Sequence, residues 1–209
     1  MGIVSTIKTR IVGWTAAGEE KTIRVNDDGE LVLANDVISL TAEPLSVVSA
    51  NFTRPNTTTQ YAINDEVSND ATAGSVVPLH FDNIVAANGD TGYIVKASLK
   101  VTGIPATASV TGALFRLYLF QTPMTPVGDN VVFPLLGADL ADAECYIDFA
   151  MLTAGTGSTA MYGLDDGLRT PFKVDAASRD LYGLLIAMGT YTPTAQSVWT
   201  VRLFAELAG

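Results

Sequence analysis

Few side chains of this chain are of a type that does acid–base or nucleophilic chemistry, and they are scattered along it. The sequence holds one histidine, His80, and one cysteine, Cys145. His80 lies in the apolar run Val76–Phe81, so we predict a hydrogen-bonded histidine of the core or of a loop, and not the base of a Ser-His-Asp triad. Cys145 has no partner for an intrachain disulfide and is predicted to be a small core residue. A zinc site rich in histidine and cysteine is excluded within one chain.

Carboxylates come closer to a catalytic pattern, because glycosidases use a pair of them. The closely spaced acidic residues are Asp65 with Glu66, Asp139 with Asp142 and Glu144, and Asp165 with Asp166. Adjacent residues of a strand point to opposite faces, which makes Asp65 and Glu66 a poor catalytic pair. Asp165–Gly167 is typical of a turn. A calcium site built from such loops stays open as an alternative, but we predict no catalytic residue and no metal ligand.

Two further segments partly match the sequence patterns of ligand-binding sites. Gly155–Ala160 has the form of the dinucleotide fingerprint, which works only where a helix follows it, and the next residues, Met161–Gly167, contain two more glycines and do not start a helix. Asp27, Asp28 and Glu30 lack the ligand spacing of a calcium loop, so a turn is predicted there. We therefore predict no cofactor.

Composition and charge exclude several classes of function. A chain of 209 residues, 48% of them hydrophobic, can bury one good core. Its net charge of −10 and its pI near 4.4 oppose direct binding to nucleic acid. No apolar stretch of roughly 18 residues predicts a membrane span. The N-terminus lacks the pattern of a secretory signal, and the short myristoylation pattern of Met1–Thr6 is not favoured. The basic residues among positions 1–24 fit either an arm that docks on an acidic neighbour or an ordinary solvated terminus.

Alternation with a period of two predicts an all-β protein. Trp199–Leu207 places apolar side chains at its odd positions and Thr200, Arg202 and Glu206 on the other face. Such segments recur every 10 to 20 residues or so back to residue 45, which predicts a jelly-roll-like β-sandwich body over residues 45–209. Residues 1–44 are predicted to form an N-terminal arm with a β-hairpin over residues 20–34 and a linker that ends at residue 44.

The strands of the body differ in whether we expect one face or both faces to be buried. Tyr93–Thr102 alternates cleanly, so one of its faces should be solvated. Ala113–Phe120 is apolar on both faces apart from Arg116, so it should lie central in a sheet or face another subunit, and Leu181–Met188 is similar. Helix is scarce, with one short helix expected over residues 136–143.

One string resembles a known family. Phe52–Pro55, followed by Thr57–Thr59 and Tyr61–Val67, is similar to a segment of virion structural proteins of tailed bacteriophages, in which a Phe-Thr-Arg-Pro stretch precedes Thr, Tyr and an acidic-Val step. The ribbon Val25–Leu33 and the ending Leu181–Glu206 also resemble theirs, and the similar stretches cover about a third of the chain. The resemblance implies a head decoration (cement) protein that sits on the outer head surface and clamps neighbouring major capsid subunits. It implies no catalytic residue.

The residues of the same string also have a local interpretation. Phe52 should enter the core, Pro55 should end a strand, and a polar loop should lead to Tyr61 at the start of the next strand. A structural corner explains the segment as well as contact with a partner does.

We therefore expect a non-enzymatic phage decoration protein, made in the host cytoplasm and located in the virion. Its expected partners are the major capsid protein and further copies of itself, as a trimer at local threefold axes, without direct contact to nucleic acid or membrane. The alternative is a tail-fibre or baseplate module that binds host carbohydrate, with Tyr162, Tyr191 and Trp14 as candidate sugar platforms. A third reading is a β-sandwich hydrolase that uses one of the carboxylate pairs.

Overall fold

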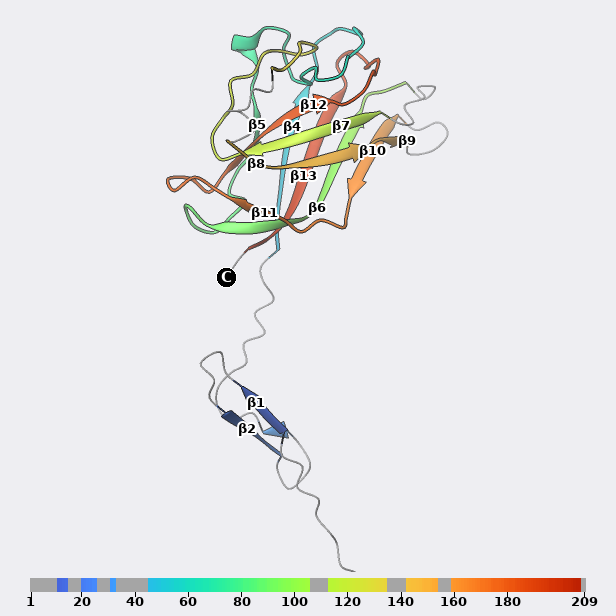
Figure 1. Ribbon diagram of the computed structural model, residues 1–209. Coiled ribbons are helices and arrows are strands. Elements are labelled where there is room, and N and C mark those ends of the chain that lie inside the picture. Colours follow the sequence, from blue (N-terminus) through green and yellow to red (C-terminus); the bar gives the residue numbers. More distant parts are fainter. Residues whose placement is uncertain are drawn as a thin grey trace, which may run out of the picture. The chain divides into compact units, whose positions relative to one another are not determined.

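The structure is a computed structural model (Figure 1). It describes residues 45–105, 113–134, 142–153 and 159–207, together with the backbone of three N-terminal strands. The chain divides into two compact units, Met1–Ala42 and Glu43–Gly209. In the part of the chain that is described, no helix is long and apolar enough to cross a membrane.

The N-terminal unit contains a three-stranded antiparallel sheet in the order β1-β2-β3. Its strands are β1 (Ile11–Trp14), β2 (Glu20–Val25) and β3 (Leu31–Val32). Pairing of Arg24 with Val32 and of Val25 with Leu31 confirms the predicted hairpin. Strand β1 was not predicted, because four residues are too few to show a period of two. The turn around residues 26–29 and the linker over residues 34–44 lie outside the described residues.

The second unit is built from strands, with one short 3-10 helix, η1 (Ala73–Ser75), among its described residues. The strands are β4 (Leu45–Thr53), β5 (Leu79–Phe81), β6 (Thr91–Thr102), β7 (Leu114–Phe120), β8 (Ala143–Ala150), β9 (Leu152–Thr153), β10 (Ala160–Asp165), β11 (Thr170–Lys173), β12 (Leu181–Ala187) and β13 (Val198–Leu207). They form two antiparallel sheets, β4-β13-β6-β10-β9 and β5-β12-β7-β8, and β11 pairs with the other end of β6 from β10. In Figure 1 the strands of one sheet cross those of the other.

The strand order is that of a jelly roll. Without the short β9 and β11, eight strands remain. The first pairs with the last (β4 with β13), the second with the seventh (β5 with β12), the third with the sixth (β6 with β10), and the two middle strands pair with each other (β7 with β8). This nesting results when one long antiparallel hairpin is rolled into two sheets. The predicted fold class, an all-β jelly-roll-like sandwich, is therefore confirmed.

The space between the sheets is filled with apolar side chains. The alternate residues of β13 and β7 that point inward are fully buried, which follows from the period of two. Phe115 packs edge-on against both Trp199 and Tyr191, with ring centroids 5.0 and 5.6 Å apart. Phe52 stacks on Trp199 from the neighbouring strand, so it enters the core as predicted.

A second apolar cluster covers the outer face of the β5-β12-β7-β8 sheet. Tyr118, Phe120, Leu184 and Ile186 point outward and are buried under Phe133 and other residues of the loop that follows β7. Strand β7 is apolar on both faces because it lies between β12 and β8 and its outer side is covered by the chain's own loop. Of the two predicted alternatives for this strand, the structure shows the central position in a sheet.

One local prediction was wrong. Tyr61 does not start a strand. It forms an isolated bridge with Tyr191, and the next strand, β5, begins only at Leu79, because the intervening loop pairs with its neighbours at isolated bridges and not in a continuous ladder. Most of the predicted helix over residues 136–143 lies outside the described residues, but Asp142 is helical, and Ala143 begins β8.

Candidate functional site

A buried polar cluster joins three loops of the body. Arg54 donates two hydrogen bonds to the Asp129 carboxylate, at 3.3 Å to Oδ1 and 2.5 Å to Oδ2, and neither side chain has exposed surface. The Tyr61 hydroxyl and the Ser68 backbone N–H both donate to Asp129 Oδ1, at 2.5 and 3.1 Å. Arg54 also donates to the carbonyl of Thr194 in the loop before β13. Arg54 and Asp129 together thus join the loops that follow β4, β7 and β12.

The electrostatics of this cluster are those of a structural clamp. Burial raises the pKa of Tyr61, and the charge of Asp129 raises it further, so the hydroxyl stays a hydrogen-bond donor. The Arg54 guanidinium lies 4.8 Å from the centroid of the Tyr61 ring. Since every charged atom has a protein partner and none reaches solvent, the cluster fixes loops and offers nothing to a substrate. The phage-like string therefore forms a structural corner, which is one of the two interpretations that its residues left open.

Asp65 and Glu66 are both buried and do not form a catalytic pair. Glu66 Oε2 accepts the backbone N–H groups of Val127 and Gly128 at 2.7 and 3.4 Å, and Asp65 Oδ2 accepts the N–H of Ala62 at 2.6 Å. Burial raises the pKa of Glu66, although the two backbone donors act in the opposite direction. This burial was not predictable from residues 65 and 66 alone, because the covering loop comes from about 60 residues further along the chain.

The other acidic groups are also held by the fold or lie apart. Glu144 accepts hydrogen bonds from the side chain of Gln121 at 2.5 Å and from the backbone N–H of Lys173 at 3.1 Å. Asp142 is exposed, and Asp139 lies outside the described residues. Asp165 ends β10, and Asp166 belongs to the loop that follows.

The glycine-rich stretch leads into a strand. Residues 154–158 lie outside the described residues, but Ala160 begins strand β10. A dinucleotide fingerprint needs a helix N-terminus at this point to hold the pyrophosphate. A strand has no such end, so the stretch does not have the geometry of that motif.

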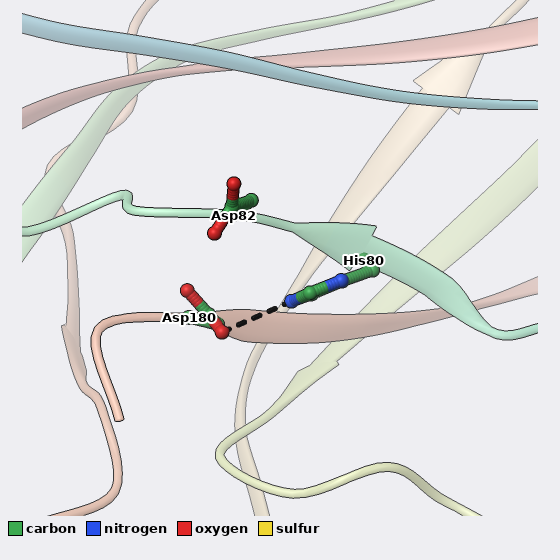
Figure 2. Close-up of side chains that lie close together, drawn as sticks. All are labelled: His80, Asp82 and Asp180. Carbon is green, nitrogen blue, oxygen red and sulfur yellow. Dashed lines mark ion pairs between the residues drawn. The ribbon is translucent and has the colours of Figure 1, made fainter. Parts of the chain in front are cut away.

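His80 lies on β5 and faces outward, so it is neither a core nor a loop residue as predicted. The reason is alternation: its neighbours Leu79 and Phe81 point into the core. Figure 2 shows His80 directed toward Asp180, with Asp82 beside them. His80 Nε2 lies 3.0 Å from Asp180 Oδ2, and the imidazole stacks on the Tyr182 ring at 4.8 Å. The predicted hydrogen bond of this histidine is present, but 46% of its side chain is exposed.

The three side chains of Figure 2 form a small polar group at the surface. One ligand atom from each of His80, Asp82 and Asp180 lies within 4.8 Å of the others, the one group of this kind among the described residues. Partial burial favours a higher pKa of Asp180. The hydrogen bonds from the Asn83 N–H and the His80 side chain outweigh this effect and lower the pKa of Asp180. Spacing along the chain does not reveal this group, because Asp180, directly before β12, is far from His80 and Asp82 in sequence.

The remaining candidate residues differ in exposure. Tyr191 is only 8% exposed and lies among core rings, so it is no sugar platform, because the turn before β13 folds it inward. Tyr162 is 41% exposed, and the side chain of Trp14 lies outside the described residues. Cys145 points inward from β8 and packs against the core, as predicted. Burial and the charge of Glu144 raise the pKa of Cys145 to about 12.

The comparisons with known proteins identify no family for this chain. No family model matches the chain, and no similar curated protein was found. Among solved structures, a structure of a marine algae virus of the order Picornavirales matches over 100% of this chain and 91% of that chain, with 11% sequence identity and a TM-score of 0.24. A TM-score this low does not show a shared fold, so the jelly-roll assignment rests on the strand order.

Proposed function

We propose that this chain is a non-enzymatic virion structural protein, a decoration protein that binds the outer surface of a bacteriophage head and stabilises contacts between major capsid subunits. The observation that carries the proposal is a jelly-roll strand order around an interior filled with side chains. Jelly rolls serve as capsid and lectin domains, among other roles. A small-molecule site needs a concave pocket with convergent polar groups. In the described part of this body the large polar clusters hold loops instead.

The phage-like string supports the same proposal in a specific way. Its Arg54 and Tyr61 both contact Asp129, and its Glu66 holds the backbone of the loop after β7. The string therefore contains the residues that fix one end of this jelly roll. A protein with a similar string has the means to fix the same loops, so the resemblance supports a related body as well as a related role.

The expected partners follow from this role. The major capsid protein is the proposed binding partner, and the N-terminal unit, with its own three-stranded sheet, is proposed as the arm that reaches over the shell. Self-association as a trimer at local threefold axes, synthesis in the host cytoplasm and a place on the outer head surface complete the proposal. Direct contact with nucleic acid or membrane is not part of it.

The experiment uses heads assembled without this protein. Purified full-length protein is added back, and the temperature at which the heads release DNA is measured. A protein that binds only the assembled shell stabilises it by mass action, so the release temperature should rise with protein concentration and then saturate. An unchanged release temperature would contradict a cement role.

Deletion of residues 1–34 tests the arm separately. The truncated body should retain its circular dichroism spectrum and lose binding to the same heads. Full binding by the truncated body would contradict a role for the arm and leave the cement role in place.

The carbohydrate-binding alternative is not proposed. Of its three candidate platforms, Tyr191 is buried, and Tyr162 is the one whose exposure the structure shows. A sugar site normally needs more than one exposed aromatic ring or a polar pocket beside it.

A further inference from the structure

The outer side of the β4-β13-β6-β10 sheet carries a group of cations, and we call this side the basic face. Lys96 and Lys100 point outward from β6, with Ser98 midway between them. Arg202 on β13 lies directly opposite Ser98. Residues that oppose each other across a sheet share a face, and diagonal neighbours are roughly 7–8 Å apart. Arg202 is therefore close to both lysines, and the three charges form a triangle.

These three cations have no acidic partner among the described residues. Glu206 is the acidic side chain that strand pairing places on this face, and it pairs with Arg169 at 3.7 Å. The body's other cations include Arg54 and Arg116, each bound to an aspartate. Like charges at diagonal positions repel each other, although less than like charges directly opposite, which destabilise a sheet. The triangle thus costs stability in the isolated protein, and an anionic surface against it would remove that cost.

The positive charge of the basic face contrasts with the negative net charge of the whole chain. The whole chain has 22 acidic and 12 basic residues, for a net charge of −10. On such a protein, a face with three unpaired cations is the side that an acidic surface approaches with least repulsion. Charge distribution alone would therefore orient the molecule in an encounter.

Aromatic and apolar side chains accompany the cations. The Lys96 ammonium lies 5.4 Å from the Phe204 ring centroid, and Tyr162 lies directly opposite Lys100. Leu152 pairs with Tyr162 on the next strand and is 62% exposed. Protein–protein interfaces are enriched in Tyr, Phe and Arg around an apolar centre. The basic face has Tyr162, Phe204 and Arg202 of these types beside its two lysines.

We propose that the basic face is the docking surface of the body, which acts together with the N-terminal arm, and that it binds an acidic surface of the head shell protein. The proposal rests on the proposed function and extends it by naming the face and the chemistry of the partner. Lys100, Arg202 and Lys96 provide the charge complementarity, and Tyr162 with Leu152 provides the apolar contact. The strongly acidic remainder of the chain repels the shell and so prevents other orientations.

Nucleic acid and anionic membranes are the competing classes of partner for a cationic face. Both carry a denser and more extended negative charge than a protein surface, and a chain of net charge −10 is repelled by them at long range. An acidic protein patch of about the size of one sheet face matches the number and the area of these three charges more closely than nucleic acid or a membrane does. The experiment includes both competitors as probes.

The experiment compares two full-length variants with the same change of charge. Lys100→Glu reverses a charge within the triangle, and Arg179→Glu, the control, reverses an exposed charge in the loop between β11 and β12. Binding to heads assembled without this protein is measured at low and at physiological salt. Lys100→Glu should weaken binding at least about tenfold at low salt and reduce its salt dependence, whereas Arg179→Glu should change affinity less than about threefold.

A second measurement separates docking from folding. Reversal of Lys100 relieves repulsion within the triangle, so the thermal midpoint of the free variant should be equal to or higher than that of the wild type. Weaker binding with an unchanged or higher midpoint supports the proposal. Weaker binding with a lower midpoint is checked with Lys100→Ser, which should give the smaller loss of affinity expected from loss of one charge, and full affinity in that variant would overturn the proposal.

The outcomes distinguish this proposal from the proposed function. If the wild type binds heads and Lys100→Glu binds equally well, the basic face is not the docking surface, although the decoration role stands. If the wild type does not bind heads at all, the decoration role itself fails. Tight wild-type binding at physiological salt to a single-stranded oligonucleotide, or to phosphatidylserine vesicles, together with its loss in Lys100→Glu, would overturn the assignment of an acidic protein as the partner.

Discussion

Arg54 and Asp129, 75 positions apart in the chain, form a two-point ion pair whose side chains have no exposed surface. The pair joins the end of β4 to the loop that covers the outer face of β12 and β7. Tyr61 and the backbone of Ser68 satisfy the remaining capacity of the carboxylate. Burying two charges costs desolvation energy, which their mutual attraction offsets. Removing one partner therefore destabilises the fold much more than replacing both partners by apolar residues.

Replacement of Asp129 by alanine should therefore be strongly destabilising. Asp129→Ala leaves the Arg54 guanidinium buried and unpaired, which should lower the free energy of unfolding by about 3–5 kcal/mol. Urea unfolding followed by tryptophan fluorescence measures the loss, because Trp199 lies in the core.

The matched control for that variant is the ion pair of Arg116 with Asp148, whose side chains are 24% and 39% exposed. Asp148→Ala should cost about 1 kcal/mol or less. If Asp129→Ala does not fold, Tyr61→Phe removes one bond to the same carboxylate and should cost about 1–2 kcal/mol. Equal losses for the two aspartate variants would contradict the role assigned to the buried pair.

The buried Glu66 predicts a pH dependence of stability. Burial raises the pKa of Glu66, so the folded state holds this proton more tightly than the unfolded state. Stability from this group is present below the unfolded pKa and is lost as pH rises through the folded pKa. Glu66→Gln has no such loss, so its free energy of unfolding relative to the wild type should increase from about pH 4 to about pH 7.

Urea titrations at several pH values measure this difference. Glu66→Ala serves as the comparison, because it also removes the acceptor of the Val127 N–H and should be less stable than Glu66→Gln at each pH. A difference between Glu66→Gln and wild type that falls with rising pH would show that Glu66 is not held as the structure has it.

Gly183 is predicted to tolerate no side chain. A Cβ atom there would lie 2.9 Å from the Phe81 ring, 3.0 Å from Leu117 and 3.2 Å from Leu79. Gly183→Ala should overpack the core between β5 and β7 and cost about 1–3 kcal/mol. Gly189→Ala, where no atom lies within 4 Å, should change stability by less than about 0.5 kcal/mol. Thermal unfolding of both variants checks this, and a neutral Gly183→Ala would contradict the packing of β12.

The thiol of Cys145 should be unreactive in the folded protein. Burial, together with the charge of Glu144, raises the pKa of Cys145 to about 12, so very little thiolate exists near neutral pH. Iodoacetamide at pH 8 should modify the folded protein far more slowly than the urea-unfolded protein, as followed by mass spectrometry. Equal rates in the two states would place the thiol at the surface.

Strands were predictable where one face is exposed to solvent and the other is buried. The predicted and observed strands β6 and β13 agree to within two residues, and in β13 the alternation reports burial directly. In β6 it does so only from Lys96 on, because a register shift beside Phe204 and Ala205 places Ile94 in the core and not Tyr93 or Val95. The surroundings of strand β7 were not predictable in this way. Its second apolar face is covered by Phe133 and its loop, and nothing in the strand itself indicates whether a loop or another subunit provides that cover.

The clusters were harder to predict than the strands. Asp129 follows a glycine in a segment typical of a turn, and only the tertiary structure brings it to Arg54. The same holds for His80 with Asp180, and for the triangle of Lys96, Lys100 and Arg202, which depends on the register between β6 and β13. Register across a sheet is set by contacts between distant segments, so spacing along the chain does not reveal it.

The most direct test of the decoration role is the position of this protein in intact particles. An antibody fragment raised against the purified body is bound to whole virions, and its position is determined by electron cryomicroscopy. We predict regular labelling over the head at fixed positions between capsomers. Labelling confined to the tail or its tip, with an unlabelled head, would contradict the decoration role.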